Sequence, residues 1–461
     1  MNNTKLFRFL KNSGAALHAP PPLGKIYPIA IILAGFMAML ALNLPGQLSY
    51  DSVIQLLDGR SGQYHTWHPP VMAFLLGLGD ALMPGTGLFV IFNAALCFLS
   101  FAAILGLRDR ITWLTVLAAL GAVLTPQFLL YPGIVWKDVL FADAAMAGFV
   151  CLGYAGKHWT NVPARLGFLA GAVSLLLVAG LARQNGPVVL VIGALALGWI
   201  AAKQAGSKMG FAYGAGGLAA VFLLLVLSSL ALNLRAAKDD GPAAQITLLK
   251  AYDIIGAQVA DPLYRPAILE SQAPFLAARM HDDGVRLYSP LKNDTLEASE
   301  ALEDAITAPA SAAPIAAQWR DLLLHRPWLY LRVRADVFTQ VFLTPALRQC
   351  VPYYLGVDGP AEDMQQLHLT RRWGAADKFL ANYTARFVGT PIFSHLAFAL
   401  LALVLLVALL RRRRPVDIAI AGLLVATLIF SGSFFVISIA CDYRYLYALD
   451  LSVLFALLYI L

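Results

Sequence analysis

The sequence predicts an all-α polytopic membrane protein with about ten transmembrane helices, juxtamembrane helices in its first outer loop and a mainly helical extracytoplasmic segment. Hydrophobic residues occupy 59% of the 461 positions and charged residues only 13%, whereas soluble domains average about 25% charged residues. Apolar runs such as GLFVIFNAALCFLSFAAILGL approach or exceed the roughly 20 residues that a helix needs to cross hydrocarbon. We expect ten spanning helices, near residues 26–44, 87–107, 111–130, 139–157, 166–181, 187–202, 211–234, 391–410, 416–438 and 446–461.

Four regions follow from the positions of these runs. Residues 1–25 are expected to form a cytoplasmic tail, and residues 26–234 a membrane domain with the first seven helices and their outer loops. Residues 235–390 are expected to form a folded segment, because their prolines, acids and amphipathic stretches are typical of a soluble region, and the count of basic residues given below places this segment outside. Within it, RDLLLHRPWLYLRVRADVF (320–338) predicts two helical pieces broken at its proline and suited to lying on the membrane surface. Residues 391–461 hold the last three helices.

The short apolar run at 69–83 decides which side of the membrane each later loop faces. If this run does not span, 14 basic residues lie on the side of the N-terminus and only four lie in short outer loops. If it does span, the two counts become seven and 11. Cytoplasmic loops carry an excess of Lys and Arg, so the first arrangement is favoured. We therefore expect a cytoplasmic N-terminus and a helix at 69–83 that lies at, or dips into, the outer face.

Charge and cysteine content narrow the class of protein further. The net charge of +7 invites a nucleic-acid interpretation, but most basic residues lie in short connections between apolar runs. Membrane topology explains them there, so we expect no nucleic-acid partner. Four cysteines are too few for a disulfide framework. Cys350 and Cys441 can pair if both face an oxidising compartment, although no spacing rule favours this.

Four basic residues are expected in the short outer loops, unlike most of the others, and each lies in an unusually polar stretch: Arg60, Lys137, Arg183 and Arg444. A single cation at the end of one helix often extends to the membrane interface and has no other role. Four together, each with acidic, amide or aromatic neighbours, favour a convergent positive site at the outer rim. The phosphate of a lipid-linked substrate carries its negative charge at that depth and suits such a site.

Two acids lie in the same outer loops. Asp51 falls in the first turn of a short amphipathic piece after Pro45 and Gly46, where a carboxylate is favoured by the helix dipole. Its alternative role is that of a general base that accepts a proton from a hydroxyl group. Asp138 follows Lys137 directly, and the two form either a local ion pair or a second acid beside a phosphate-binding lysine.

The stretch QYHTWHPP supplies further candidates. His68 precedes two prolines that direct the chain into the surface helix, and we interpret its ring as a protonated hydrogen-bond donor to phosphate. Two histidines three residues apart also raise the possibility of zinc, but the segment offers no third ligand. Aromatic side chains flank the charged residues, so we place four residues in the substrate pocket: Tyr50, His65, Trp67 and Trp136.

At these residues the chain resembles the integral-membrane glycosyltransferases of the GT-C superfamily, especially the protein mannosyltransferases and aminoarabinose transferases. The resemblance rests on the order of Asp51, His68-Pro69-Pro70, Asp138 and Arg444-Tyr445, with a long outer segment after the seventh helix. It is clearest over residues 26–160. Many members of the superfamily carry paired acids in the first loop, whereas Ser52 follows Asp51 here, which disfavours a metal site.

The resemblance implies an activity and a set of partners. Such enzymes transfer a sugar from a polyprenyl-phosphate carrier to a glycan, lipid or protein acceptor at the outer face of the cytoplasmic membrane. Asp51 and Asp138 would then be catalytic, and the carrier phosphate would be held by His68, Lys137, Arg183 and Arg444. No cofactor is predicted, and a divalent metal stays open as an alternative. A transporter or flippase for a lipid-linked saccharide is the competing interpretation, since it would use the same cations.

Overall fold

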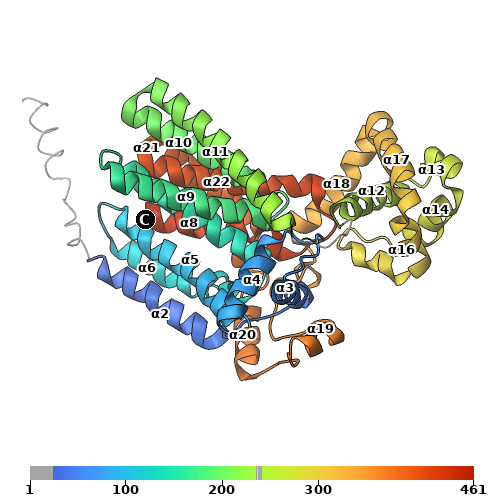
Figure 1. Cartoon of the computed structure of the whole chain (residues 1–461), viewed down its shortest axis with the longest axis horizontal. Coiled ribbons are helices and arrows are strands. Elements are labelled where there is room, and N and C mark those ends of the chain that lie inside the picture. Colours follow the sequence, from blue (N-terminus) through green and yellow to red (C-terminus); the bar gives the residue numbers. More distant parts are fainter. Residues whose placement is uncertain (1–23, 235, 237–240) are drawn as a thin grey trace, which may run out of the picture.

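The computed structural model describes residues 24–234, 236 and 241–461, and every regular element in them is a helix. The predicted all-α polytopic architecture is confirmed. Figure 1 shows a bundle of long helices with a separate group of shorter helices at one end. Nine of the helical segments described are long and apolar enough to cross a membrane. They are α2 (Ile26–Asn43), α5 (Gly87–Gly106), α8 (Lys137–Lys157), α9 (Val162–Ala182), α10 (Val188–Ala205), α11 (Ser207–Asn233), α21 (His395–Arg412), α22 (Pro415–Ile437), and the segment Tyr443–Ile460 formed by η7 (Tyr443–Leu446) and α23 (Tyr447–Ile460).

The helix expected at 111–130 is broken. It consists of α6 (Trp113–Val123) and a second piece, Pro126–Gly133, that contains α7 (Pro126–Leu129) and η1 (Tyr131–Gly133), and the two pieces meet at an angle of 63°. Thr125 is extended, with a ψ of 151°, because the residue before a proline is disfavoured in the helical region. If the bent pair is one span, the described residues hold ten spans.

Helix α8 is the centre of the bundle. It is the most buried of the apolar helices that the structure describes, and it packs against α5, α9, α22 and α23. Close packing is possible because many of its residues are Ala or Gly. A side chain at Gly148 would overlap Leu176 of α9 at 2.7 Å. The N-terminus of α8 is therefore held by neighbours on all sides at the end of the bundle.

The short apolar run forms half of a helical hairpin. Helix α4 (Val71–Leu82) has 12 residues, about 18 Å at 1.5 Å per residue, which is too short for a hydrocarbon core of about 30 Å. It packs against α3 (Tyr50–Ser61) at two glycines, where a Cβ on Gly77 would lie 2.2 Å from the Gly59 carbonyl oxygen. Arg60 closes the hairpin by two hydrogen bonds of 2.7 and 2.8 Å to Asp80.

The group of shorter helices has a core of its own, built around Tyr252, Ile255 and Val337. None of its described helices meets the criteria for a span. The expected break at Pro327 is confirmed, since one helix ends at His325 and the next begins at the proline. The group contains α12 (Gly241–Ala260), α13 (Ala267–Gln272), α14 (Pro274–Arg279), η2 (Met280–Gly284), α15 (Val285–Leu287), η3 (Asn293–Ala298), α16 (Glu300–Thr307), η4 (Pro309–Ser311), α17 (Ala312–His325) and α18 (Pro327–Phe342).

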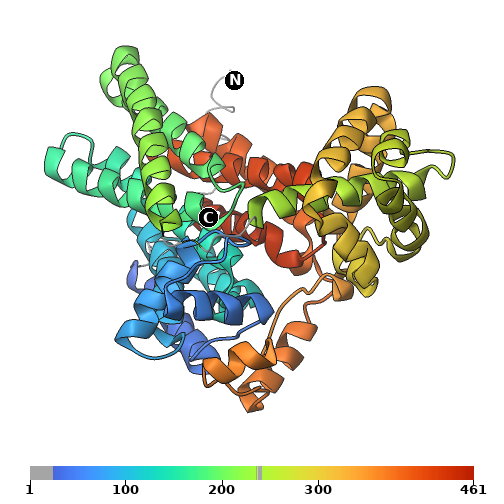
Figure 2. The same ribbon diagram turned by 45° about the vertical axis from the view of Figure 1, so that its right-hand side comes forward.

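A second set of short elements returns the chain to the bundle. Figure 2 shows α19 (Ala361–Gln366) and α20 (Ala375–Ala385) apart from the α12–α18 group. They contact α3 and α2 respectively. The remaining short elements are η5 (Leu347–Gln349) and η6 (Pro391–Phe393).

Several contacts fix the α12–α18 group to the bundle, and two of them involve buried side chains. Arg334 is fully buried and forms an ion pair of 2.6 Å with Asp253, while its other nitrogens donate to carbonyls at the end of α22. Arg334 therefore does not lie on a membrane surface, as the basic face of 320–338 had suggested. The second connection is a disulfide between Cys350 and Cys441. It joins the segment after α18 to the turn that begins the last helix.

The opposite end of the bundle gathers basic residues. The Lys157 ammonium donates to the Gly106 carbonyl at 2.7 Å, and Lys25 donates to the Arg108 carbonyl at 3.1 Å. Arg414 forms an ion pair of 2.8 Å with Asp109. These residues are among the 14 that the charge count assigned to one side, and their contacts lie between loops at a single end of the helices.

Candidate functional site

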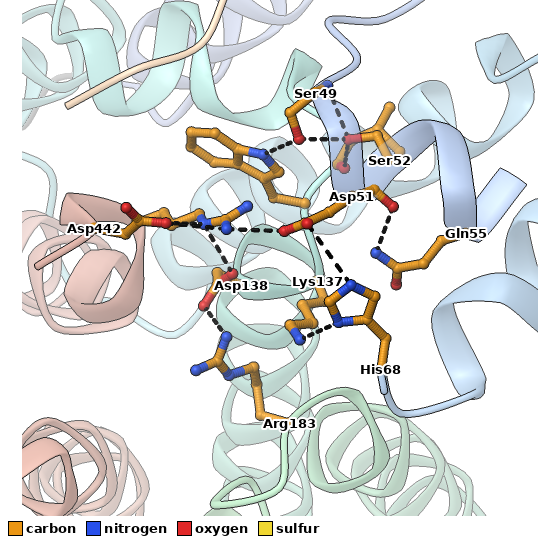
Figure 3. A network of polar contacts seen from close by, with 12 residues as sticks. Ser49, Asp51, Ser52, Gln55, His68, Lys137, Asp138, Arg183 and Asp442 are labelled. Atoms are coloured by element: carbon orange, nitrogen blue, oxygen red, sulfur yellow. Dashed lines mark hydrogen bonds and ion pairs between the residues drawn. The ribbon is translucent and has the colours of Figure 1, made fainter. Parts of the chain in front are cut away.

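A cluster of charged side chains from α3, the start of α8 and neighbouring segments lies at one end of the bundle (Figure 3). Its members come from segments far apart in the sequence, so only the fold brings them together. They are Asp51 of α3, His68 before α4, Lys137 and Asp138 at the start of α8, Arg183 at the end of α9, and Asp442 and Arg444 at the start of the last helix.

Serine side chains hold the start of α3 against α8. The Ser52 hydroxyl accepts from the Ser49 amide at 3.1 Å and donates to the Val135 carbonyl at 2.7 Å. The Trp136 indole N–H donates to the Ser49 hydroxyl at 2.9 Å. These bonds join the first turn of α3 to the residues just before Lys137, and they place Asp51 beside the N-terminus of α8.

Arg444 is the centre of the acidic part of the cluster. Its Nη2 lies 2.9 Å from Asp51 Oδ2 and 3.0 Å from Asp442 Oδ2, and its Nε lies 3.9 Å from Asp138 Oδ2. The guanidinium carbon lies 4.8 Å from the centre of the Trp136 ring, a cation–π distance. One cation is thus shared among three carboxylates, of which Asp138 has a second cationic partner in Arg183.

Arg183 and Asp138 form the deepest pair of the cluster. Arg183 Nη1 lies 2.6 Å from Asp138 Oδ1, and the two side chains are only 7% and 2% exposed. Arg183 also lies over the rings of Phe434 and Tyr445. Because each charge is already paired and buried, this pair positions the start of α8 more readily than it meets a ligand.

Lys137 differs from the other cations of the cluster. Its ammonium lies 2.8 Å from His68 Nδ1, and among the residues that the structure describes no carboxylate lies within 4.0 Å of it. An ammonium can only donate hydrogen bonds, so Nδ1 accepts and the ring hydrogen is on Nε2. That nitrogen lies 3.7 Å from Asp51 Oδ1. Lys137, His68 and Asp51 therefore form a chain in which the lysine end has unused charge.

The protonation of His68 differs from the sequence-based interpretation. Burial and the positive charge of Lys137 lower the pKa of His68 from 6.5 to about 4. The imidazole is therefore neutral near pH 7, and the expectation of a proton-bearing, positively charged ring is corrected. A neutral ring still offers one N–H donor, from Nε2, toward Asp51.

Asp51 is ionised in this setting. Burial alone would raise its pKa, but the contact with His68 and the charges of Arg444 and Lys137 outweigh burial and hold the pKa well below its ordinary range. Its side chain is 29% exposed, compared with 2% for Asp138. Of the two carboxylates Asp51 and Asp138, Asp51 is therefore the one that a ligand can reach.

Tyr50, His65 and Arg60 were expected in the site and lie outside the cluster. His65 is 60% exposed, and its Nδ1 contacts Asp58 at 2.6 Å. Tyr50 is 59% exposed, although it directly precedes Asp51. Arg60, one of the four cations that escape the inside bias, is occupied by Asp80 within the α3–α4 hairpin. Their polar or aromatic character suggested the site, but local partners and solvent exposure account for them.

Trp136 and Trp67 have different positions. Trp136 is 2% exposed and lies under Arg444 inside the cluster. Trp67 is 44% exposed and lines a separate pocket against the α12–α18 group. Of the four residues assigned to a substrate pocket, the structure therefore brings only Trp136 into direct contact with the charged residues.

Sequence reasoning missed Asp442. Its carboxylate lies 3.0 Å from Arg444, and burial raises its pKa although the nearby Arg444 charge lowers it. A signal was available, since the stretch CDYRYLYALD places this acid two residues before the arginine. The disulfide at Cys441 is adjacent and anchors the same turn.

A metal ion does not fit these donors well. Across residues 24–234, 236 and 241–461, no group of three His, Cys, Asp or Glu side chains is arranged to hold one. Asp51, Asp138 and Asp442 all face the guanidinium of Arg444, so a divalent cation would have to displace an arginine. The second histidine of the zinc alternative, His65, is turned to Asp58.

Comparisons with protein-family models, curated proteins and solved structures found no match to this chain. The chemistry of the cluster is therefore interpreted from its own geometry. That geometry combines a partly exposed carboxylate, a mostly buried histidine and a lysine that has no acidic partner within the described part of the chain, all at one end of a membrane bundle.

Proposed function

We propose that the protein is a glycosyltransferase that moves a sugar from a polyprenyl-phosphate carrier to an acceptor hydroxyl at the outer face of the cytoplasmic membrane. One observation carries the proposal. Lys137, a cation without a carboxylate partner among the described residues, contacts His68, whose other ring nitrogen lies 3.7 Å from the partly exposed carboxylate of Asp51. An anion-binding group and a base candidate thus lie on either side of one histidine ring, 2.8 and 3.7 Å from its two nitrogens.

The phosphate of the carrier is expected at Lys137 and Arg444. Lys137 supplies an unpaired charge, and Arg444 supplies a guanidinium with donors in a fork that fits a phosphate. Both residues begin helices at the same end of the bundle, where the head group of a membrane lipid would lie. The buried Arg183–Asp138 pair stabilises this arrangement from below and need not contact the ligand.

Asp51 is the favoured base. In the ligand-free arrangement its pKa is too low for efficient proton transfer, since a general base works best near the operating pH. A phosphate group that engages Arg444 and Lys137 would draw both charges away from Asp51 and raise that pKa. Binding of the donor would therefore activate the base that the acceptor needs.

The reaction follows from these positions. The acceptor oxygen attacks the anomeric carbon from the side opposite the phosphate, and the carbon–oxygen bond to the phosphate breaks. Asp51 accepts the hydroxyl proton, while Lys137 and Arg444 stabilise the negative charge that develops on the departing carrier phosphate. Attack from the opposite side inverts the anomeric configuration. The proton and the leaving phosphate are both accounted for by residues of the chain, so this step requires no metal or cofactor.

Two features support an extracytoplasmic site and a cytoplasmic N-terminus. The disulfide next to Asp442 belongs to an oxidising compartment. The basic contacts of Lys25, Lys157 and Arg414 lie at the other end of the helices, as the positive-inside rule expects of the cytoplasmic face. The sequence resemblance to the GT-C superfamily points to the same sidedness.

The test is a transfer assay with the purified full-length chain in lipid nanodiscs. Labelled polyprenyl-phosphate sugars are offered with a crude envelope extract as acceptor, and wild type is compared with Asp51→Asn and Lys137→Ala. Asp109→Asn is the matched control, because it removes the same charge from an ion pair at the opposite end of the bundle. We expect transfer by wild type and the control and little by the other two variants.

Other outcomes point elsewhere. Undiminished transfer by Asp51→Asn would contradict the role of the base. Absence of transfer with every donor, together with substrate-dependent movement of a lipid-linked saccharide across vesicles, would favour the transporter.

A further inference from the structure

Helix α20 lies against the bundle at the end that carries the charged cluster. It contacts α2, and Figure 1 shows it beside the C-terminal end of that helix. The residue Arg372, just before α20, donates to the Gly46 carbonyl at 2.8 Å and to Gln47 Oε1 at 2.9 Å, in the connection from α2 to α3. Because α2 is long and apolar enough to span and ends at Asn43, α20 lies near the level at which lipid headgroups surround the bundle.

α20 also covers the end of the broken span. Helix α6 has 11 residues, about 17 Å at 1.5 Å per residue, so it crosses only about half of a hydrocarbon core of about 30 Å. The Tyr383 hydroxyl of α20 donates to the carbonyl of Leu124, which directly follows α6, at 2.5 Å. The ring of Tyr383 lies next to those of Phe379 and Phe387, at centre distances of 6.1 and 5.3 Å. Aromatic residues with a polar tip are enriched where membrane meets water, so this row of rings indicates an interfacial helix.

The two faces of α20 differ in exposure. The face turned to the protein consists of Asp377, Leu380 and Thr384, which are buried. The other face is exposed and carries Lys378, Phe379 and, directly after the helix, Arg386. Phe379 is 52% exposed, and Trp373, two residues before the helix, is 55% exposed. On such a face, rings and the apolar stems of cations enter the lipid while the charges reach the headgroups.

The cations of this exposed face lack acidic partners. Among the residues that the structure describes, neither Lys378 nor Arg386 forms an ion pair. The one acid of α20, Asp377, is occupied by Arg372 at 3.5 Å and by the Gly374 amide at 2.7 Å. The face therefore has positive charge that no described part of the fold neutralises, and it attracts anionic groups.

A hollow of about 450 Å³ adjoins the C-terminal end of α20 and adds a third cation, Arg348. Arg348 is exposed and forms no ion pair within the described part of the chain. The other residues that line the hollow carry no charge: Val351, Pro352, Tyr353, Ala385 and Val388. One cation above a mainly apolar hollow fits the phosphate of a lipid over its acyl chains.

We propose that α20 and Arg348 form a docking surface for anionic lipids in the leaflet at this end of the bundle. Trp373 and Phe379 insert between the headgroups, while the cations of the exposed face and Arg348 meet the lipid phosphates. The surface shares no residue with the charged cluster, so the inference does not depend on the proposed transfer. A lipid surface is favoured as the occupant because unpaired cations and exposed rings lie together beside the end of a span.

The test measures the opening of α20 in two kinds of membrane. The purified full-length chain is placed in nanodiscs of phosphatidylcholine alone and in nanodiscs of equal parts phosphatidylcholine and phosphatidylglycerol. Hydrogen–deuterium exchange with mass spectrometry follows the peptides that cover residues 373–388. Because α20 must release its lipid contacts to open, lipids that bind the closed form slow its exchange. We expect exchange to be at least about fivefold slower with the anionic lipid, the factor that one cation near an anionic surface contributes.

Variants identify the residues that are responsible. Lys378→Gln/Arg386→Gln should remove most of the difference between the two membranes, and Arg348→Gln should reduce it by a smaller factor. The matched control is Arg265→Gln/Arg320→Gln, which removes two exposed, unpaired cations from the α12–α18 group and should behave as wild type does. Trp373→Ala/Phe379→Ala should speed exchange in both membranes, since the rings insert whatever the charge of the lipid. Thermal unfolding in phosphatidylcholine shows that each variant is folded.

Several outcomes would overturn the inference. Equal exchange of wild type in the two membranes would do so, as would a lipid effect that Lys378→Gln/Arg386→Gln retains in full. Inorganic phosphate that slows exchange in phosphatidylcholine as much as phosphatidylglycerol does would indicate a site for a free anion. Exchange that slows with protein concentration and ignores the lipid would indicate a second copy of the chain as the occupant. No transfer is measured, so a failure of the proposed transferase would leave each of these results unchanged.

Discussion

Two Arg–Asp pairs in this molecule have similar geometry and different surroundings. Arg334 and Asp253 lie 2.6 Å apart and are 0% exposed, while Arg444 and Asp51 lie 2.9 Å apart and are 14% and 29% exposed. The remaining donors of Arg334 meet backbone carbonyls, and the second oxygen of Asp253 accepts from Trp319. Arg444 is instead shared among several carboxylates. A closed pair holds two parts of a fold together, whereas a shared and partly open pair can exchange partners with a ligand.

The largest effect on the rate of transfer is expected at the shared pair, Arg444 and Asp51. Asp51→Asn keeps the shape of the side chain and removes the base, so we expect transfer to fall about 10²- to 10⁴-fold, the usual contribution of general base catalysis. Initial rates at saturating donor and acceptor measure this. Thermal unfolding should change far less than it does for Arg334 variants, because Arg444 keeps Asp442 as a partner. A variant that unfolds as readily as an Arg334 variant would show that Asp51 is structural.

The closed pair should control stability. Arg334→Met leaves the buried charge of Asp253 without its partner, and we expect a loss of about 3–5 kcal/mol. Chemical unfolding followed by Trp fluorescence measures it. The exposed pair Arg371–Asp358 provides the control, since Arg371→Met should cost less than about 1 kcal/mol. Arg334→Met/Asp253→Leu should regain part of the loss, and no recovery would mean that the pair is not the reason for it.

The disulfide links the two regions and should have an intermediate effect. Cys350→Ser/Cys441→Ser opens a loop with a sequence separation of 91 residues, and removal of such a bridge costs about 2–5 kcal/mol. Because Cys441 precedes Asp442, the variant should also lower transfer at low donor concentration, which a KM measurement detects. Cys151→Ser alters a half-buried free thiol and is the control. An unchanged KM would separate the disulfide from the positioning of Arg444.

The spanning helices and the end of the bundle that carries the charged cluster could be predicted from the sequence. Apolar run lengths gave the helices, and the exceptional cations Lys137, Arg183 and Arg444 marked the end of the bundle where the cluster lies. The span at 111–130 was expected to be one helix, although Pro126 is a local signal for the break that the structure shows. Arg60 and His65 were misassigned because their partners, Asp80 and Asp58, lie close in the sequence and satisfy them within the hairpin.

Other features required the three-dimensional arrangement. The pairing of Arg183 with Asp138 depends on how α9 packs against α8, and no pattern in either helix specifies it. The neutral state of His68 depends on its burial beside Lys137, which the diproline motif does not reveal. Composition thus predicts where charge gathers at the end of the bundle, whereas packing decides which charges remain available for a ligand.

The smallest expected effect concerns His68 and the pH dependence of the free energy of unfolding. Its pKa in the folded protein is about 4, below the ordinary value of 6.5, so the unfolded chain takes up the proton first as the pH falls. Stability is therefore unaffected by this group above pH 6.5 and decreases as the pH falls from 6.5 toward about 4. His68→Gln should lose at least about 1 kcal/mol less than wild type over that window.

The window also separates His68 from its neighbour. The pKa of Asp51 is lowered from 3.8, so its stabilising contribution is present above pH 3.8 and is lost only at lower pH. Chemical unfolding of wild type and His68→Gln, measured between pH 7 and about 4, isolates the histidine because the other carboxylates are common to both. His325→Gln is the control, since that side chain is 72% exposed. Parallel stability curves for wild type and His68→Gln would mean that His68 titrates as a solvent-exposed histidine does, and the chain from Lys137 to Asp51 would then contain a positively charged ring.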